Sequence, residues 1–595
     1  MKEGEQLSSS SIPRRDKSAH VRCFQEPETC PLYQMAEPKF RDALIKNPHL
    51  FRYIHNLDHL PVYKEQLSRG VDEDIPSLIY PVGDPVFIHV LSRGAKERRL
   101  YVPIEPKLPE AESRKILNNV MRLIAMVIGE REEFKNLEEK RRKLEKYLSK
   151  VVKVSNKISR LGRKYVIYRN YMLVSKDVWT FIHYSVLKEL AGIGYLEPII
   201  RDPYIEDISV PGAGPVFIEH KVFESCEATI RFDVKTLKAY VERLGQIIGR
   251  MPSLRRPIVD GSLPDGSRIN IVYGDDVSLR GPNLTIRKFS SKPLSIVQLI
   301  RFGSLNYLMA AYLWMLFENM MNVWFCGETA SGKTTLMNAC LAFIPFNFKV
   351  VSIEDTPEVV TPHANWVREC TRDSSEGKGV DLFDLLRAAL RQRPNYIIVG
   401  EIRGKEGNVA FQAMQTGHGV IATFHAGSVE KLIQRLTAYP IEVPKTYIDN
   451  LNAVTIQSAV RHPKTGKLVR RVLGIYELLG YDAYTNRFQF VEIFSWDPVT
   501  DSHIFRGEGT SYLLEEKIAQ RKGIPRKHLR KIYEELNARA EILRLADMAD
   551  LTDYYQLFEL FKEVRLRGPF EVLEDMRTKG VKELLGRIES TIGAT

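Results

Sequence analysis

The sequence predicts a multidomain protein of the α/β class with a parallel sheet near its centre. At 595 residues the chain is too long for one hydrophobic core. From 295 to about 480, four short apolar strands alternate with helical segments, which is typical of a parallel sheet covered by helices on both faces. One of these strands, "NVWFC", runs into the glycine-rich turn "GETASGKT" and then into the helix "TLMNACLAF". This strand, turn and helix indicate an anion-binding loop at one edge of the sheet.

The composition is that of an ordinary globular protein. Hydrophobic residues make up 44% and charged residues 27% of the chain, which excludes global disorder and a fibrous class. The apolar run at 307–317 is shorter than the ~18 to 20 residues that span a bilayer, and the polar N-terminus lacks the apolar core of a secretory signal. The six scattered cysteines form no CxxC pair. We therefore expect a cytosolic protein with reduced thiols.

Two features near the N-terminus and in the overall charge leave alternatives open. Cys23, Cys30 and His20 lie close together, but their spacing matches no common zinc pattern, so we expect ordinary surface or core residues. The net charge of +12 is compatible with nucleic acid and with the anionic face of a membrane as partners. Charge alone does not choose between these two classes.

The first two predicted segments precede the central sheet. Residues 1–110 mix proline, glycine and charge with apolar runs such as "SLIYPVGDPVFIHVL", and we interpret them as an accessory N-terminal domain with strands. Residues 111–190 form a helical segment, in which one long helix or two joined helices are expected up to about 160. Its apolar residues recur at intervals of three, four or seven: Phe134, Leu137, Leu144, Leu148 and Val151. A helix packed on its own chain is favoured over a partner-binding arm.

Three further segments complete the expected organisation. Residues 191–294 alternate β-branched runs with Pro and Gly and predict a mixed α/β domain. Residues 295–496 carry the parallel sheet. Residues 497–595 contain charged amphipathic stretches such as "YYQLFELFKEVRL" and predict a helical C-terminal domain.

The glycine-rich turn fits the pattern GxxxxGK[ST] of a phosphate-binding loop. Its glycines allow successive backbone N–H groups to face a polyphosphate, and the following helix adds its positive N-terminal end. Lys333 is then expected to reach the β- and γ-phosphates and the Thr334 hydroxyl to ligate Mg²⁺. The candidate nucleotide-binding residues of the loop are Gly327, Glu328, Thr329, Ala330, Ser331, Gly332, Lys333, Thr334 and Thr335.

Two acidic residues and two histidines end or flank neighbouring strands. Glu354 closes "KVVSIE" and Glu401 lies in "YIIVGEIRG", so both should meet the phosphate loop at the carboxyl edge of the sheet. With Thr334 they are the candidate Mg²⁺ ligands, and one of the two acids would activate water; which one is left open. His418 and His425 bracket "GVIATF", where a histidine can sense the γ-phosphate, although a lone histidine is more often a structural donor.

Taken together, "GETASGKTT", "SIEDTPE", "IIVGEIRG" and "TGHGVIATFHAGS" resemble the Walker A, Asp box, Walker B and His box of type II and type IV secretion ATPases. They occupy residues 327–335, 352–358, 396–404 and 416–428, and the stretch 265–289 is similar to the hallmark of the family's N-domain. The resemblance covers roughly 190–500. It implies a RecA-like P-loop NTPase core that follows a mixed α/β N-domain.

The resemblance also implies ligands and roles. ATP and Mg²⁺ are the expected cofactors, Lys333, Glu354, Glu401 and His425 the expected catalytic residues, and His418 a nucleotide contact. Three arginines of the N-domain, Arg268, Arg280 and Arg287, are candidates for reaching the phosphates, in a role that suits the planar donor fork of arginine. No cysteine follows Cys370, so the zinc-bearing bacterial subtype is disfavoured and no zinc is expected. The stretch "SLRGPNLTIRKF" is similar to sequences of the archaeal branch of the family, whose members drive archaella, type IV pili or adhesion filaments.

Three hypotheses follow for function. The first is a cytosolic, Mg²⁺-dependent, homohexameric ATPase that associates peripherally with the membrane, pushes on a polytopic platform protein and so assembles pilin-like subunits or exports protein. The rival is a DNA-transfer ATPase; because acids are interspersed with the bases and no stacking groove can be recognised, nucleic acid is the less favoured partner. The third, a scaffold that does not hydrolyse ATP, would lack a catalytic acid or the lysine, and both are present.

Overall fold

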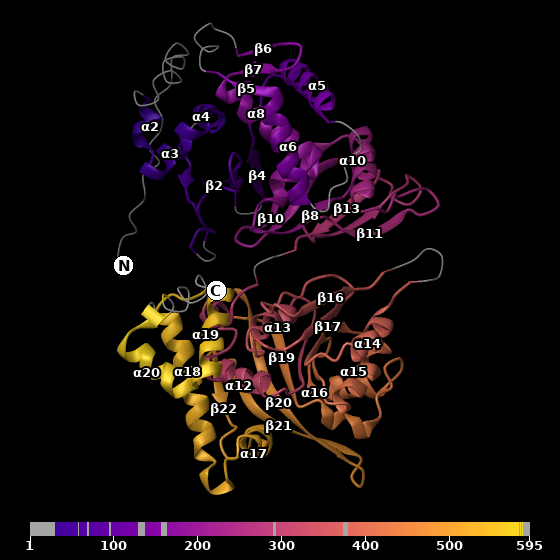
Figure 1. Cartoon of the computed structure of the whole chain (residues 1–595), viewed down its shortest axis with the longest axis vertical. Coiled ribbons are helices and arrows are strands. Elements are labelled where there is room, and N and C mark those ends of the chain that lie inside the picture. Colours follow the sequence, from indigo (N-terminus) through magenta and orange to yellow (C-terminus); the bar gives the residue numbers. More distant parts are fainter. Residues whose placement is uncertain are drawn as a thin grey trace. The chain divides into compact units, whose positions relative to one another are not determined.

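The chain forms two compact units in the computed structural model, unit 1 (Met1–Phe289) and unit 2 (Ser290–Thr595) (Figure 1). The structure describes residues 30–57, 59–67, 71–94, 97–128, 137–155, 164–289, 293–372, 379–581, 583–584 and 586. His20, Cys23 and Phe134, which the sequence analysis singled out, lie outside these described residues.

Unit 1 begins with three short helices, α2 (Pro31–Met35), α3 (Pro38–Lys46) and α4 (Pro48–His55). Each starts with a proline at its first position, where the missing N–H would have no helical partner anyway. Their apolar faces pack on the first strands of the unit through a small core that includes Phe40, Leu50 and Phe87. The helices therefore cover one end of a sheet.

That sheet has ten strands, in the order β1-β2-β3-β4-β10-β9-β8-β13-β12-β11. The strands are β1 (Val62–Tyr63), β2 (Ser77–Pro81), β3 (Phe87–Leu91), β4 (Arg99–Ile104), β8 (Ile205–Val210), β9 (Gly214–His220), β10 (Glu224–Phe232), β11 (Ile258–Ser262), β12 (Arg268–Val272) and β13 (Asn283–Arg287). β4 joins the two halves, since it pairs in parallel with β10 with Arg99 opposite Cys226. The expected accessory domain and the expected mixed α/β domain thus share one sheet and one core, on which α10 (Val234–Ile247) packs. A pairing over more than 100 residues leaves no local sequence signal.

The segment between the two halves of the sheet is helical with a small sheet inside it. Its helices are α5 (Glu110–Val127), α6 (Leu137–Val151), α8 (Lys176–Leu190), the 3₁₀ turn η2 (Gly194–Leu196) and α9 (Glu197–Ile200), and its strands are β5 (Val152–Val154), β6 (Tyr165–Ile167) and β7 (Met172–Val174). Leu148 and Val151 are buried in one cluster with residues of α5 and α8, and Leu144 is buried as well, so this stripe packs on its own chain. Strands of three residues are too short to show a period, which is why the sequence predicted only helix here.

Unit 2 is built on a nine-stranded sheet in the order β16-β15-β17-β18-β14-β19-β20-β21-β22. The strands are β14 (Val323–Gly327), β15 (Val350–Glu354), β16 (Trp366–Cys370), β17 (Tyr396–Ile402), β18 (Gly419–Phe424), β19 (Ala453–Arg461), β20 (Leu468–Asp482), β21 (Arg487–Asp497) and β22 (Ser502–Phe505). The first six strands in the order are parallel and the last three add antiparallel hairpins. The predicted α/β class with a RecA-like core is confirmed.

Helices cover both faces of this sheet. Figure 1 shows α14 (Leu382–Arg391), α15 (Glu406–Gln415) and α16 (Val429–Thr437) on one side and the C-terminal helices on the other. On the second face lie α11 (Ile296–Arg301), α12 (Tyr307–Glu318) and α13 (Lys333–Leu341), and a 3₁₀ turn, η3 (Lys445–Asn450), precedes β19. α12, the apolar run of the sequence, is buried on all sides as a core helix. Within the described ranges, no helix combines the length and apolar character needed to cross a membrane.

The C-terminal helices belong to the same core as α12 and α13. They are η4 (Leu513–Ile518), α17 (Ala519–Arg521), η5 (Arg526–His528), α18 (Arg530–Met548), α19 (Tyr554–Arg567) and α20 (Pro569–Thr578). Buried Arg539 of α18 lies 2.7 Å from Glu318 of α12 and 2.8 Å from Glu535, with its guanidinium over the Trp314 ring. Residues beyond 497 therefore pack on the core of unit 2, and β22 extends its sheet.

Candidate functional site

The phosphate loop links β14 to α13, and close contacts fix its glycines. A Cβ on Gly327 would lie 2.3 Å from the carbonyl oxygen of Gln457 on β19, so no side chain fits there. Gly332 caps α13 with φ of 91°, a left-handed conformation that favours glycine. Ala330 also has a positive φ, 61°, which costs about 1 kcal/mol for a residue with a Cβ. The local sequence therefore dictates a turn whose conformation is costly for other residues.

Lys333 is buried and directed back into this loop. Its Nζ donates to the carbonyl of Glu328 at 2.8 Å, and the Ser331 hydroxyl donates to the same oxygen at 2.8 Å. Burial lowers the pKa of Lys333, whereas the nearby carboxylate of Glu401 raises it. The ammonium thus lies beside the backbone groups of the loop and near the carboxylate of Glu401, which comes from β17, two strands away from β14 in the sheet.

Glu401 stands where β17 departs from regular pairing. The register between β17 and β18 shifts between Val399 and Ile402, and such a bulge re-aims the side chain that it carries. One carboxylate oxygen of Glu401 lies 2.7 Å from Nε2 of His425, and Arg403 donates to the other. Burial lowers the pKa of His425 and Glu401 opposes this effect, while Glu401 raises the pKa of Arg403. Glu401 is therefore held between two basic groups.

Glu354 ends β15 in a different environment. Its Oε1 accepts hydrogen bonds from the backbone N–H groups of Glu358 and Val359, both at 2.6 Å. Its Oε2 is buried, accepts no hydrogen bond from the described residues and lies 3.6 Å from Nε of Arg368. Burial raises the pKa of Glu354 to about 7, against the two amides and Arg368. Gly400 makes room for it, since a Cβ there would lie 3.2 Å from Cγ of Glu354.

The two histidines lie at opposite ends of β18, which corrects one prediction. His425 follows the strand at the carboxyl edge and meets Glu401. His418 precedes the strand, and its Nδ1 lies 2.8 Å from the carbonyl oxygen of Pro394. Six strand residues at about 3.3 Å each separate the two by roughly 20 Å. The prediction that His418 binds nucleotide is therefore wrong, because parallel strands present only their carboxyl ends to the phosphate loop.

The three arginines predicted to reach the phosphates are exposed on unit 1. Arg268 of β12 stands directly opposite Arg287 of β13, and Asp260 and Asp207 flank the pair. Like charges in opposite positions weaken a sheet, so this pairing is not explained by sheet stability. Arg280 lies on the loop before β13, where its carbonyl accepts from the N–H of Ala213. Their contact with nucleotide stays a prediction, because the phosphate loop belongs to unit 2.

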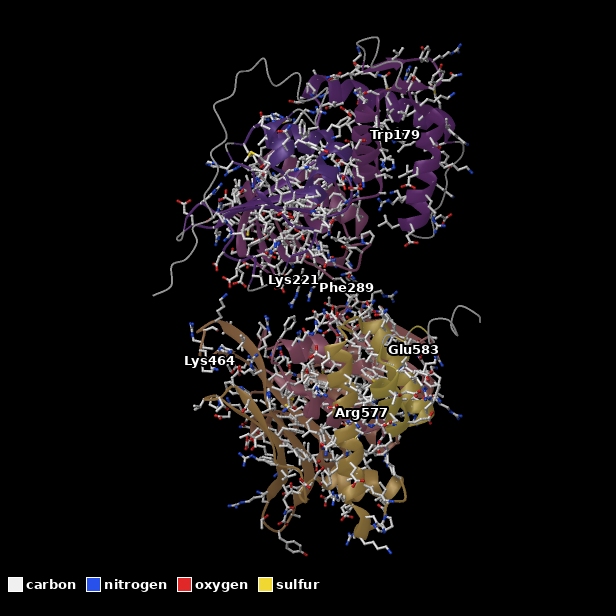
Figure 2. The ribbon with its side chains drawn as sticks, turned by 90° about the vertical axis from the view of Figure 1, so that its left-hand side faces the viewer. Trp179, Lys221, Phe289, Lys464, Arg577 and Glu583 are labelled. Atoms are coloured by element: carbon white, nitrogen blue, oxygen red, sulfur yellow. The ribbon has the colours of Figure 1, made fainter. Side chains whose placement is uncertain are left out.

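Two residues near the loop were not singled out by the sequence. Arg470 comes from the hairpin between β19 and β20, whose turn carries Lys464 in Figure 2. Its Nε donates to the carbonyl of Ala330 at 2.9 Å. Asn338 of α13 is buried and bonds to the segment that follows Glu354. Arg470 lies 140 positions from the loop residue that it contacts, so no local pattern could find it.

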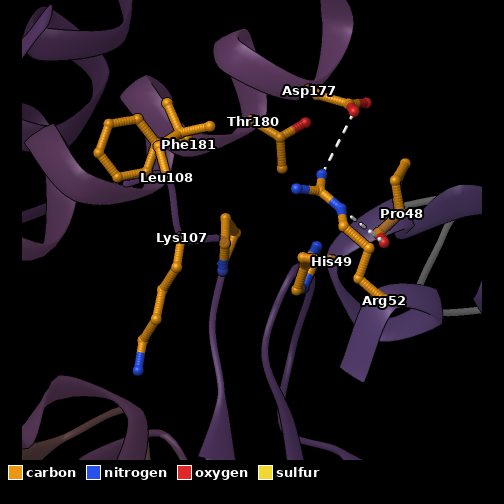
Figure 3. Close-up of a pocket in the computed structure, with 9 residues that line it drawn as sticks. Pro48, His49, Arg52, Lys107, Leu108, Asp177, Thr180 and Phe181 are labelled. Carbon is orange, nitrogen blue, oxygen red and sulfur yellow. Dashed lines mark hydrogen bonds and ion pairs between the residues drawn. The ribbon is translucent and has the colours of Figure 1, made fainter. Parts of the chain in front are cut away.

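A separate hollow of about 260 Å³ lies within unit 1 between α4, the 106–108 stretch and α8 (Figure 3). Arg52 and Asp177 face each other across it at 3.4 Å, and His49 contacts the carbonyl of Pro85. The charged groups of α4 and α8 thus neutralise one another. We interpret this hollow as part of the contact between the two helices.

The donors at the phosphate loop fit magnesium only if a nucleotide supplies further ligands. Among the described residues, no group of three or more His, Cys, Asp or Glu side chains could hold a metal ion. Mg²⁺ is usually bound through one or two protein oxygens together with phosphate oxygens and water. The Thr334 hydroxyl at the start of α13 and the Glu401 carboxylate near the end of β17 are oxygen donors of this kind.

Comparison with known proteins finds a family model, two relatives and one solved structure that are similar to this chain. A model of the family described as "Type II/IV secretion system protein" matches residues 189–544. The uncharacterized protein MJ0900 of Methanocaldococcus jannaschii is 44% identical over 552 residues, which cover 90% of this chain and 99% of that protein. The type IV secretion system protein VirB11 of Brucella suis is 30% identical over 288 residues, 42% of this chain and 78% of VirB11. A crystal structure of the VirB11 ATPase from the Brucella suis type IV secretion system, in complex with sulphate, has 26% identity and a TM-score of 0.26, and the match covers 48% of this chain and 93% of that chain.

Proposed function

Because the chain belongs to the type II/IV secretion system protein family, we propose that it is a Mg²⁺-dependent ATPase that powers such a system. The observation that carries the proposal is the convergence of the phosphate loop, Glu354 and Glu401 at the carboxyl edge of one parallel sheet. Lys333 and the loop amides bind and orient the β- and γ-phosphates in this scheme. Bound Mg²⁺ supplies charge neutralisation at the phosphates, with Thr334 and Glu401 as its protein oxygens.

The two acids differ in ways that support different roles. Glu354 keeps one oxygen fixed by two amides and leaves the other without a hydrogen bond, so Oε2 can accept a proton from water. Glu401 lies between two basic groups: Arg403 donates to one of its oxygens, and the other lies 2.7 Å from Nε2 of His425 without a hydrogen bond among the described residues. Glu354 is therefore the general base, and Glu401 would hold the ion together with Thr334. His425 then links Glu401 to the γ-phosphate side of the site.

The partners proposed for the motor go beyond the site. A homohexamer, a polytopic membrane platform protein and pilin-like subunits are proposed on membership of the family. Arg268, Arg280 and Arg287 are the arginines that we propose as phosphate contacts. Their exposure supports this role.

Hydrolysis of ATP by the purified full chain tests the proposal. We expect turnover that requires Mg²⁺ and is lost in Lys333→Ala together with nucleotide binding. Lys431→Ala, an exposed lysine of α16, is the matched control and should keep both. Wild-type turnover without Mg²⁺, or full activity of Lys333→Ala, would refute the assignment of the site.

Cross-linking in native membranes tests the partner. The Glu354→Gln variant, trapped with ATP, should recover a multi-spanning membrane protein and pilin-like subunits. Recovery of DNA instead, together with DNA-stimulated hydrolysis that falls steeply with salt, would support the DNA-transfer ATPase.

A further inference from the structure

A short segment after β15 is held from two sides by hydrogen bonds. Residues 358–360 lie outside regular secondary structure, so their backbone groups need partners other than a helix or a strand. The N–H groups of Glu358 and Val359 donate to Oε1 of Glu354. The side chain of Asn338 hydrogen-bonds to both the carbonyl of Glu358 and the N–H of Val360.

Asn338 lies on α13, five positions after Lys333 and on the same helix. Only 8% of its surface is exposed. Its Nδ2 donates to the carbonyl of Glu358 at 2.9 Å, and its Oδ1 accepts from the N–H of Val360 at 3.2 Å. The side chain thus bridges the helix that carries the phosphate-binding lysine to the peptide groups that bind Glu354.

The back of the same segment is fixed as well. The Tyr554 hydroxyl of α19 donates to the carbonyl of Asn338 at 3.2 Å and to that of Val360 at 3.4 Å. Downstream, Nε2 of His363 lies 3.1 Å from the carbonyl oxygen of Ile344, and the His363 ring packs edge-on against Phe558 of α19. The C-terminal helices thus hold Val360 and His363. The peptide group between Glu358 and Val359 is held by Asn338 and by its own hydrogen bond to Glu354.

We propose that Asn338 is a positioning residue for Glu354: from the phosphate-loop helix it fixes the peptide group between Glu358 and Val359, whose N–H donates to the base carboxylate. The inference rests on the proposed function. Removing both Asn338 bonds releases this peptide group, and the carboxylate that it holds moves with it. A displacement of about 1 Å at a reacting group can cost about 100-fold in rate.

The test separates turnover from nucleotide affinity. In Asn338→Ala we expect kcat to fall about 10- to 100-fold, while the Kd for ADP stays within about threefold, because the phosphate loop itself keeps its contacts. Asn338→Leu fills the space without hydrogen bonds, so a loss common to both variants reports the bonds and not a cavity. Cys340→Ala, a buried position on the same helix, is the control and should match the wild type.

A double-mutant cycle decides whether Asn338 acts through Glu354. If it does, adding Asn338→Ala to Glu354→Gln lowers kcat no further. An additional loss in the double variant, or a Kd that rises as much as kcat falls, would overturn the inference and leave Asn338 a structural residue of α13. Wild-type kcat in both Asn338 variants would overturn it too. Absence of ATP turnover in the wild type would instead overturn the proposed function.

Discussion

Each unit buries a cluster of ionisable groups, and the two clusters differ in how fully they are satisfied. In unit 1, Asp202 is buried and accepts from the hydroxyls of Tyr80 at 2.6 Å and Tyr101 at 2.8 Å and from the N–H of Tyr204 at 2.8 Å. In unit 2, Oε2 of Glu354 is equally buried and accepts no hydrogen bond from the described residues. A satisfied polar network stabilises and specifies a fold, whereas an open acceptor costs stability and is available for chemistry. The difference supports a structural role for the first cluster and the proposed catalytic role for the second.

The largest effect is expected when the buried acid of unit 2, Glu354, is neutralised. Glu354→Gln should lower kcat by at least about 100-fold, because a positioned general base contributes about 10² to 10⁴. The free energy of unfolding should not fall, since a neutral amide is easier to bury than a carboxylate. Steady-state kinetics, ADP titration and urea unfolding measure the three quantities. Turnover close to the wild type would assign the base to Glu401.

Removing the acid of unit 1 should have the opposite signature. Asp202→Ala leaves two buried hydroxyls and one N–H without their acceptor, and we expect a loss of about 3 kcal/mol in the free energy of unfolding. Hydrogen exchange read by mass spectrometry should rise in unit 1 and stay unchanged in α13 and β14 of unit 2. Equal exchange increases in both units would show that the network is not local to unit 1.

Acid should weaken unit 1 through His220, which lies 3.0 Å from the Tyr80 hydroxyl. Its Nδ1 accepts from the N–H groups of Val222 and Phe223, and burial lowers its pKa to about 3. Because the folded pKa lies below the unfolded value of about 6.5, this stability is present above pH 6.5 and is lost as pH falls toward 3. At pH 4.5 the loss amounts to about 2 to 3 kcal/mol.

Comparing unfolding at pH 7 and pH 4.5 in wild type and His220→Gln isolates this contribution. The variant should be less stable at pH 7 but should lose less stability on acidification. An identical pH dependence in the two proteins would mean that His220 is not the titrating group.

The smallest effect is expected from removing the contact between Arg470 and the phosphate loop. Arg470→Ala removes the donor to the Ala330 carbonyl and should weaken ADP binding about fivefold, which corresponds to about 1 kcal/mol. Arg461→Ala, on the same hairpin but bonded only to the turn carbonyl of Gly466 in the described structure, should leave ADP affinity unchanged. A uniform loss in both variants would point to the charge of the hairpin and not to the loop contact.

The organisation of unit 1 as a single sheet could not be predicted from the sequence, for a physical reason. Each strand of its sheet has a local pattern, but the pairing of β4 with β10 depends on residues more than 100 positions apart. The short strands β5, β6 and β7 have no period at all. The strand pairing and the shared core determine the arrangement, and both depend on residues that are far apart in the sequence.

The phosphate loop and the two acids at the same edge of the sheet could be predicted from local patterns in the sequence. Gly327 and Gly332 set the backbone of the loop locally, and parallel strands with helical crossovers must place Glu354 and Glu401 at the same edge. Only the tertiary structure decided that His425 and not His418 meets Glu401, that Oε2 of Glu354 stays open, and that Asn338 and Arg470 hold the segments around the site. These relations depend on which strand end a residue occupies and on contacts between distant elements. Backbone conformation is a local property of the chain, whereas the partners of a buried polar atom are fixed by the packing of the whole core.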